Sequence, residues 1–283
     1  MDDRVLARLR CPVCAEPLTG TTAGTARALR CPRGHSFDIA RQGYVNLLAG
    51  RAPHTGDNAE MVAARAGFLA AGHYDTVAAA LAGTAVRVAG SDPYPLVVDA
   101  GAGTGHYLAA VLAALPDAAG LALDVSKPAL RRAARAHPRA AAALADTWQR
   151  LPLADRSTAV LLNVFAPRNG PEFHRVLDPG GVLLVVTPAA DHLTELVDAL
   201  DLLRVDPDKA DRVAGSLGGH FAEESATGHR ARLALTRAEV TTLVGMGPSA
   251  WHTDPQRLAA RIAALPEPVP VTLSVRLGVH RPR

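Results

Sequence analysis

The stretch Leu96-Val-Val-Asp-Ala-Gly-Ala-Gly-Thr-Gly-His-Tyr107 decides the fold of this chain. An apolar run leads into Asp99, and Gly101, Gly103 and Gly105 follow at alternate positions before a helical segment begins. Glycines at these positions allow the backbone to approach a ligand closely, and the helix that follows directs its N-terminus at that ligand. A nicotinamide-binding turn carries its third glycine where this chain has a histidine. The stretch therefore predicts a strand, a cofactor-binding turn and a helix, but not a dehydrogenase.

Strands and helices alternate along the chain around this turn. Apolar runs predict strands at 96–99, 120–123, 141–145, 158–165 and 182–187, with helices between them at 107–115, 128–137 and 171–177. Such alternation is typical of a parallel sheet with helices on both faces. Further helices are expected at 58–71, 76–89, 192–203, 208–216, 237–246 and 255–265, and further strands at 232–236 and 271–279. The predicted fold class is α/β, with a Rossmann-like, seven-stranded sheet.

The three cysteines of the chain all lie in one short N-terminal segment. Cys11-Pro-Val-Cys14 and Cys31-Pro-Arg-Gly-His35 place two ligand pairs on two tight turns. Three thiolates and one imidazole complete a tetrahedral Zn²⁺ site with no open position, and a closed site of this kind is structural. The alternative is that the cysteines are free and buried, but their spacing favours metal.

Composition and charge limit the classes of protein to which the chain can belong. Hydrophobic residues make up 48% of the 283 residues, which indicates a globular protein. No apolar run reaches the ~18 residues of a membrane span, and the polar start Met1-Asp2-Asp3-Arg4 lacks a signal core, so we expect a cytoplasmic protein. Residues 1–56 hold eight arginines against four acidic residues. This basic segment suits nucleic-acid contact, although solvated surface charge is an alternative explanation.

These observations divide the chain into three parts. Residues 1–36 form a zinc-ribbon-like module that includes a Thr/Gly/Ala-rich connector at Thr19–Ala26. Residues 37–57 are expected to be an extended linker, and residues 58–283 to be the catalytic domain. The small module cannot bury a large core, so the metal must contribute to its folding.

Two acidic residues follow the second and third predicted strands of the catalytic domain. Asp124 ends the second strand, where a carboxylate can accept hydrogen bonds from both ribose hydroxyls of a nucleoside cofactor. It can also cap the next helix, and both roles are compatible. Asp146-Thr147-Trp148 follows the third strand, where this kind of fold commonly binds the adenine.

The D-x-G-x-G-x-G form of the glycine turn resembles the first motif of class I S-adenosylmethionine methyltransferases. Cys31-Pro-Arg-Gly-His-Ser-Phe-Asp-Ile-Ala-Arg-Gln-Gly-Tyr-Val-Asn-Leu-Leu48 resembles the junction between zinc site and linker in the 23S rRNA (guanine-N1)-methyltransferases. Further matches include Asn163-Val-Phe-Ala-Pro-Arg168 and Met246-Gly-Pro-Ser-Ala-Trp-His252, and the branch most similar to this chain confers resistance to tylosin- and mycinamicin-type macrolides. The resemblance implies methylation of guanine N1 in a hairpin loop of domain II (hairpin 35, position 748 in the usual rRNA numbering). It also implies a homodimer whose zinc modules grip RNA.

The resemblance also implies which residues bind S-adenosylmethionine. In class I methyltransferases the acid after the strand helps organise the site around the amino-acid end of the cofactor, which implies this role for Asp99. Gly101 and Gly103 let the backbone come close to the cofactor. Direct contacts carry over to Tyr74, Gly105, His106 and His192. Each has another interpretation: Tyr74 can pack at the sheet edge, Gly105 serves the turn in either case, His106 can simply begin a helix, and His192 can lie at the surface.

Substrate contacts are expected at the exit of the fourth strand and in a late loop. Asn163 can pair with a base edge, and Asn163 and His192 are the two candidate catalytic residues, although the sequence assigns no general base. Phe165 can stack on the target base or pack in the core, and Arg168 lies in the same segment. Trp251 and His252 follow a Gly-Pro turn and can contact a loop base.

Two other functions compete with this prediction. A small-molecule methyltransferase that acts on a quinone or a macrolide would carry an apolar lid in place of a basic zinc module. A non-enzymatic zinc-ribbon RNA binder would show a damaged cofactor motif, yet the acids and glycines of the motif are intact.

Overall fold

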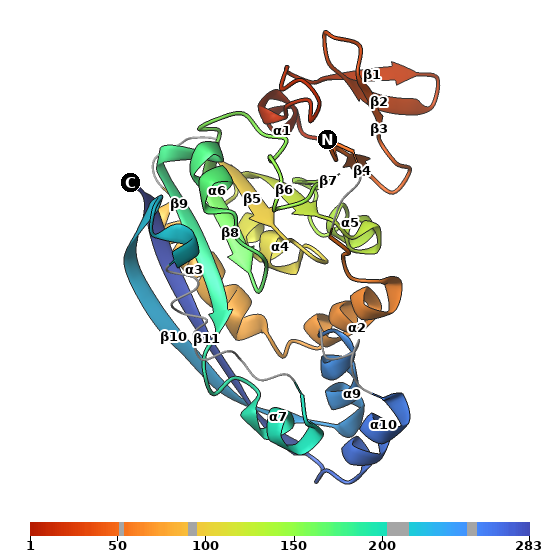
Figure 1. The fold of residues 1–283 in the computed structure, drawn as a ribbon, viewed down its shortest axis with the longest axis vertical. Helices are drawn as coiled ribbons and strands as arrows, with labels where there is room; N and C mark the ends of the chain where they lie inside the picture. Colours follow the sequence, from red (N-terminus) through yellow and green to blue (C-terminus); the bar gives the residue numbers. More distant parts are fainter. Residues whose placement is uncertain (51–53, 90–94, 203–214, 248–253) are drawn as a thin grey trace.

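The computed structural model describes residues 1–50, 54–89, 95–202, 215–247 and 254–283. Within these ranges, eight strands form one sheet in the order β10-β11-β9-β8-β5-β6-β7-β4 (Figure 1). The strands from β9 to β4 are parallel, whereas β11 is antiparallel to both β9 and β10. The strands are β4 (Tyr44–Asn46), β5 (Leu96–Ala100), β6 (Ala119–Asp124), β7 (Ala140–Leu144), β8 (Thr158–Val164), β9 (Leu177–Pro188), β10 (Phe221–Leu235) and β11 (Val269–Pro282).

Helices cover both faces of this sheet, as the alternating pattern predicts. The central strands are buried on both sides, and their side chains divide between two apolar layers. One layer packs against α3 and α4, and the other packs against α6 and the N-terminal module. The helices are α2 (Ala59–Ala70), α3 (Asp75–Val88), α4 (His106–Ala114), α5 (Lys127–Ala133), α6 (Gly170–Val176), α7 (Thr194–Leu200), α9 (Arg237–Gly245) and α10 (Pro255–Ala263).

The N-terminal module consists of α1 (Asp3–Arg8) and a small antiparallel sheet of β1 (Thr19–Ala23), β2 (Ala26–Arg30) and β3 (Ser36–Asp38). The segment expected to be a connector at Thr19–Ala26 is therefore largely a hairpin. Its turn contains Gly24, whose φ of +60° suits glycine. β1 is exposed along its whole length, so its residues need not be apolar and its sequence lacks an apolar strand pattern.

The module and the catalytic domain share one apolar layer. Val5, Leu9 and Leu29 belong to the same buried cluster as the sheet residues Leu121 and Leu161. The chains also pair directly: Leu9 forms a β-bridge with Leu153, and the N–H of Arg10 donates to the carbonyl of Pro152 at 3.0 Å. The module is thus packed on the body of the protein, at the top of Figure 1.

Part of the range 37–57, expected to be a linker, belongs to the main sheet. Tyr44 pairs with Ala142 and Asn46 with Leu144, so β4 adds to the edge of the sheet beside β7. This strand makes eight strands where the sequence predicts seven. The difference arises because β4 has only three residues, too few for a periodic pattern.

Several other boundaries differ from the sequence prediction. The strand expected at 232–236 is the end of β10, which begins at Phe221 and pairs with β11 along its length. The helix expected to reach His137 ends at Ala133. Most of the helix expected at 208–216 lies outside the described residues. No described helix has the length and apolar character needed to span a membrane.

Candidate functional site

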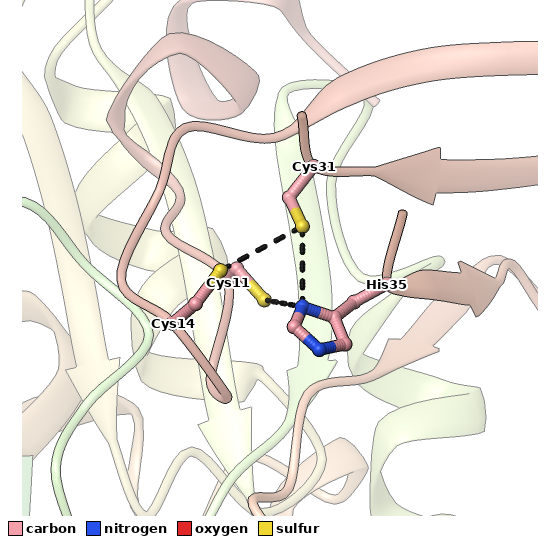
Figure 2. A group of neighbouring side chains, drawn as sticks. All are labelled: Cys11, Cys14, Cys31 and His35. Carbon is pink, nitrogen blue, oxygen red and sulfur yellow. Dashed lines mark hydrogen bonds between the residues drawn. The ribbon is translucent and has the colours of Figure 1, made fainter. Parts of the chain in front are cut away.

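The four predicted metal ligands converge in the N-terminal module. Cys11 and Cys14 lie on the turn after α1, and Cys31 and His35 lie on the turn between β2 and β3 (Figure 2). Their ligand atoms all lie within 4.8 Å of one another. The Sγ atoms of Cys14 and Cys31 are 3.7 Å apart, and Nδ1 of His35 is 3.3 Å from Sγ of Cys31 and 3.6 Å from Sγ of Cys11.

These separations match the edges of a tetrahedron around zinc. Zn–S bonds of about 2.3 Å and a Zn–N bond of about 2.0 Å place tetrahedral ligand atoms roughly 3.5–3.8 Å apart. The two cysteines deepest in the module, Cys11 and Cys31, are buried, and His35 presents Nδ1 to the cluster. The residues therefore fit a structural Zn²⁺ whose four positions are all filled by protein.

Two adjoining cavities lie at the carboxyl ends of the parallel strands. The first, of about 290 Å³, is lined by Tyr74, His106 and His192 and is called here the Tyr74 cavity. The second, of about 310 Å³, is lined by Asp124 and Asp146 and is called the Asp146 cavity. Both are lined by Arg65, Gly101, Phe165 and Met246. Together they form an elongated cleft at the place where open α/β sheets bind ligands.

The glycine turn forms the floor between the two cavities. Gly101 has a φ of +84°, and a Cβ at this position would lie 2.4 Å from the Cβ of Ala166. Gly105 has a φ of +79° and caps α4, and its missing Cβ admits the backbone of Ala133. Only glycine fits at these two positions, which explains the motif found in the sequence. Gly103 belongs to the turn and lines the Tyr74 cavity.

The Asp124 carboxylate is held rigidly at the end of β6. Its Oδ2 accepts a hydrogen bond from the N–H of Gly103 at 2.8 Å, and its Oδ1 accepts one from the N–H of Ser126 at 2.8 Å. Burial raises the pKa of Asp124, while these two backbone hydrogen bonds oppose the shift. The carboxylate retains unused acceptor sites, and Asp124 lines the Asp146 cavity. The helix cap predicted as its other role is supplied by Ser126, whose Oγ accepts from the N–H of Ala129.

Tyr74 and His192 face each other across the wall of the Tyr74 cavity. The Tyr74 hydroxyl lies 3.4 Å from Nε2 of His192, and both side chains are buried. Nδ1 of His192 accepts the N–H of Ser274 at 3.2 Å, so a neutral imidazole carries its proton on Nε2. The Nε2–H of His192 is therefore directed at the Tyr74 hydroxyl, and this geometry disfavours His192 as a general base. His106 also lines this cavity, and burial lowers its pKa, which favours the neutral imidazole.

Asp99 lies buried beneath the turn and does not line either cavity. Neither of its carboxylate oxygens has a hydrogen-bond partner in the structure. Burial, together with the nearby carboxylate of Asp124, raises the pKa of Asp99 to about 8. Asp99 therefore lies beneath the glycine turn, out of direct contact with both cavities.

Asp146 lies at the end of β7 with its carboxylate almost fully buried. Its Oδ1 accepts the N–H of Trp148 at 3.0 Å, and its Oδ2 lies 2.8 Å from Nδ1 of His54. The rings of His54 and Trp148 are 6.1 Å apart, and both residues line the Asp146 cavity. Neither His54 nor Arg65 was expected from the sequence, because nothing in their local pattern distinguishes them from other linker or helix residues.

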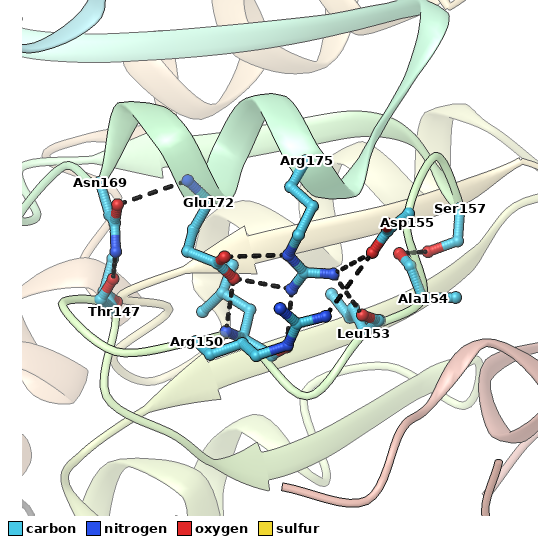
Figure 3. Close-up of polar contacts among 10 residues, drawn as sticks. Thr147, Arg150, Leu153, Ala154, Asp155, Ser157, Asn169, Glu172 and Arg175 are labelled. Carbon is cyan, nitrogen blue, oxygen red and sulfur yellow. Dashed lines mark hydrogen bonds and ion pairs between the residues drawn. The ribbon is translucent and has the colours of Figure 1, made fainter. Parts of the chain in front are cut away.

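A polar network fixes the segment that follows Asp146. Arg175 of α6 donates to both carboxylate oxygens of Glu172, to Asp155, and to the carbonyls of Leu151 and Leu153 (Figure 3). Asn169 donates to the carbonyl of Thr147 at 3.0 Å. These bonds hold residues 147–155 against α6, so the wall of the Asp146 cavity is rigid.

The substrate candidates occupy different environments. Phe165 lines both cavities, is 40% exposed, and stacks on His192 with ring centroids 6.1 Å apart. Its φ of +52° is unusual for an aromatic residue, and strain of this kind clusters at functional sites. Arg168 is half-buried and lines neither cavity, and burial lowers its pKa. Trp251 and His252 lie outside the described residues.

Asn163 does not have the position expected of a catalytic residue. It is fully buried, and its Nδ2 donates to the carbonyls of Ala100 and Pro167 at 3.1 and 2.8 Å. With both amide protons used in this way, Asn163 joins the ends of β5 and β8 and has no donor left for a base edge. The prediction that it contacts substrate is therefore not supported by the geometry.

Comparison with known proteins agrees with this architecture. A family model of the N-terminal zinc ribbon of RlmA matches residues 9–52, and a methyltransferase-domain model matches residues 97–181. A Micromonospora griseorubida protein whose name assigns it to the 23S rRNA (guanine-N(1)-)-methyltransferases is 68% identical, with all of both chains covered. The 23S rRNA (guanine(748)-N(1))-methyltransferase of Streptomyces fradiae is 55% identical, covering 100% of this chain and 99% of that protein.

A Bacillus subtilis protein, YxjB, whose name assigns it to the same class, is 29% identical and covers 95% of this chain and 96% of its own length. These identities extend over both the zinc module and the catalytic domain. The predicted fold class, the S-adenosylmethionine cofactor and the structural zinc are confirmed. The chain belongs to the 23S rRNA (guanine-N1)-methyltransferase family, as a zinc ribbon packed on a class I S-adenosylmethionine-dependent methyltransferase domain.

Proposed function

We propose that this protein methylates N1 of guanine 748, in the usual rRNA numbering, in hairpin 35 of domain II of 23S rRNA. The observation that carries the proposal is the 55% identity, over the full chain, to the Streptomyces fradiae protein named for this guanine. Methylation there would give resistance to tylosin- and mycinamicin-type macrolides. The work would take place in the cytoplasm, where ribosomes are assembled.

The two cavities suit the two ends of S-adenosylmethionine. The adenosine part fits the Asp146 cavity, where Asp124 accepts from the ribose hydroxyls and Asp146 from the adenine amino group. The methionine part fits the Tyr74 cavity, beside His106 and His192. The cofactor, when bound, would supply an electrophilic methyl group, and Phe165 is the aromatic residue common to the two cavities that would hold it.

The chain's own residues contribute mainly by positioning and by excluding water. Methyl transfer needs the guanine N1 aligned with the methyl group at near-attack distance. The half-exposed ring of Phe165, braced by His192, provides a stacking surface for the target base. The N1 proton must leave before or as N1 attacks the methyl group, because the nitrogen lone pair is needed for the new bond.

RNA binding is assigned to the N-terminal segment that includes the zinc module, because residues 1–56 hold eight arginines against four acidic residues. The module would bind the phosphate backbone of the RNA while the hairpin loop enters the cleft. A homodimer would present two such modules to the RNA. Arg168, Trp251 and His252 remain candidates for substrate contacts, and Asp99, Gly101, Gly103 and Gly105 for the cofactor motif.

Primer extension on 23S rRNA tests the proposed function. N1 methylation blocks Watson–Crick pairing, so reverse transcriptase stops at the modified guanine. Cells that express the protein should show a new stop at guanine 748 and grow at higher tylosin concentrations. A Gly103→Asp variant, which places a side chain where φ is +54° beside Arg65, should show neither. A protein that binds S-adenosylmethionine yet produces no stop anywhere in 23S rRNA would contradict the proposal and favour a small-molecule substrate.

A further inference from the structure

Residues 54–57 cross the Asp146 cavity as a strap that begins after the zinc module and ends before α2. His54, Thr55, Gly56 and Asp57 all line this cavity. His54 lies on the strap and Asp146 on the opposite wall of the cavity, and the two residues are 92 positions apart in the sequence. It therefore connects the N-terminal segment to the adenosine side of the cofactor cleft.

The strap is anchored at its far end by three contacts. Ser126 Oγ donates to the carbonyl of Asp57 at 2.6 Å, and the Asp57 carboxylate forms an ion pair with Arg65. Gly56 packs so closely on Ser126 that a Cβ would lie 2.8 Å from its backbone nitrogen. Arg65 in turn donates to the carbonyl of Met246 at 2.8 Å. These contacts fix the position of the strap and therefore limit the positions that the His54 side chain can occupy.

At the start of the strap, His54 contacts the Asp146 carboxylate, which has unused hydrogen-bond acceptor sites. Asp146 is 1% exposed, whereas the His54 side chain is 50% exposed. A carboxylate offers about four acceptor sites, and His54 and the Trp148 N–H use two of them. The His54 N–H and the backbone N–H thus orient the carboxylate of Asp146, a residue that lines the cavity.

We propose that His54 is a positioning residue for cofactor recognition, which orients the Asp146 carboxylate toward the exocyclic amino group of adenine. The inference rests on the assignment of adenosine to the Asp146 cavity under the proposed function. Without His54, Asp146 loses one of its two orienting bonds and can rotate away from the ligand. The preference for an amino group over a carbonyl at that position of the base should then fall.

The test compares two ligands that differ at this edge of the base. S-adenosylhomocysteine carries the amino group, and S-inosylhomocysteine carries a carbonyl oxygen in its place and a proton on the adjacent ring nitrogen N1. Calorimetry on the full-length, zinc-loaded wild type should show at least about tenfold tighter binding of the adenine compound, because a buried carboxylate rejects a carbonyl. In His54→Ala the preference should fall to about threefold or less. His54→Asn should restore it, because the amide can donate to Asp146.

The control is His229→Ala, a matched substitution on β10 that lines neither cavity and should keep the wild-type preference. Equal zinc content and circular dichroism show that each variant is folded. A wild-type preference that persists in His54→Ala overturns the role of His54 while leaving the adenosine assignment intact. A wild type that binds both compounds equally overturns the assignment itself. A wild type that binds neither contradicts the proposed cofactor site.

Discussion

The carboxylate of Asp124 and the backbone N–H of Gly103 are joined by a 2.8 Å hydrogen bond that links residues 21 positions apart in the chain. The bond ties the end of β6 to the glycine turn after β5. The residue assigned to the ribose and the loop assigned to the methionine part are therefore held at a constant separation. A substitution at Asp124 should weaken cofactor binding both by losing a ligand contact and by loosening this turn.

Asp124→Asn should weaken S-adenosylhomocysteine binding by about 10- to 100-fold, the range expected for loss of a charged hydrogen-bond acceptor. Isothermal titration calorimetry measures the change. Asp117→Asn, at an exposed loop position outside the cleft, is the matched control and should bind as the wild type does. Equal affinities for the two variants would show that Asp124 does not contact the cofactor.

Phe165→Leu should lower kcat/KM on 23S rRNA about 10-fold, because it removes a ring that stacks on the target base. Affinity for S-adenosylhomocysteine should change by less than about threefold, since leucine keeps the apolar wall. Steady-state methylation of an rRNA fragment gives the rate. Phe165→Tyr keeps the ring and should retain activity. Full activity in the leucine variant would leave Phe165 with a packing role alone.

Asp99 should make the stability of the ligand-free protein depend on pH. Its pKa is raised to about 8 in the folded protein from an ordinary value of 3.8, so the folded state holds a proton that the unfolded state releases above about pH 4. A rise in pH through this window therefore favours unfolding, by at most about 1.4 kcal/mol per pH unit. Above pH 8 the effect should level off.

Urea unfolding of wild type and Asp99→Asn between pH 5.5 and 8.5 checks this dependence. Asparagine mimics the protonated acid, so the variant should show a shallower decline in the free energy of unfolding than the wild type. Asp117→Asn should follow the wild type. Parallel slopes for Asp99→Asn and wild type would place the proton elsewhere.

His35→Ala should remove zinc from the N-terminal module and lower the free energy of unfolding by about 3 kcal/mol or more, because metal ligation contributes directly to folding. Zinc content by atomic absorption and denaturant unfolding measure the two effects. His137→Ala, outside the metal cluster, is the control and should retain zinc. A His35→Ala protein with its zinc and wild-type stability would mean that another group completes the site.

The cofactor motif was predictable because its residues have strong local requirements. Gly101 and Gly105 occupy positive-φ positions where a Cβ would collide with neighbours, so the sequence pattern follows directly from the backbone. Asp124 and Asp146 were found because they follow buried strands, and parallel strands bring their carboxyl ends to one edge. The zinc ligands were likewise apparent from spacing alone.

His54 and the first half of β10 could not be predicted in the same way. His54 reaches the site only through the path of the strap, and its partner is 92 residues away. The first half of β10 shows an exposed, largely polar face with no alternation of apolar residues, and its pairing with β11 makes it a strand. Asn163 is the opposite case. The sequence predicts a substrate contact for this polar residue at the end of a strand, but its side chain points inward and donates to two backbone carbonyls.

The pairing of β4 with β7 has a consequence for how the nascent chain matures. The four zinc ligands, the last of which is His35, precede β7 in the chain and are synthesised before it, so the module can acquire its metal early. Tyr44 must nevertheless wait for its partner Ala142, almost a hundred residues later in synthesis. Contacts this distant in sequence form slowly. We expect a metal-loaded module that remains undocked until β7 emerges, during which time the apolar side chains of Val5 and Leu9 lack the layer that buries them.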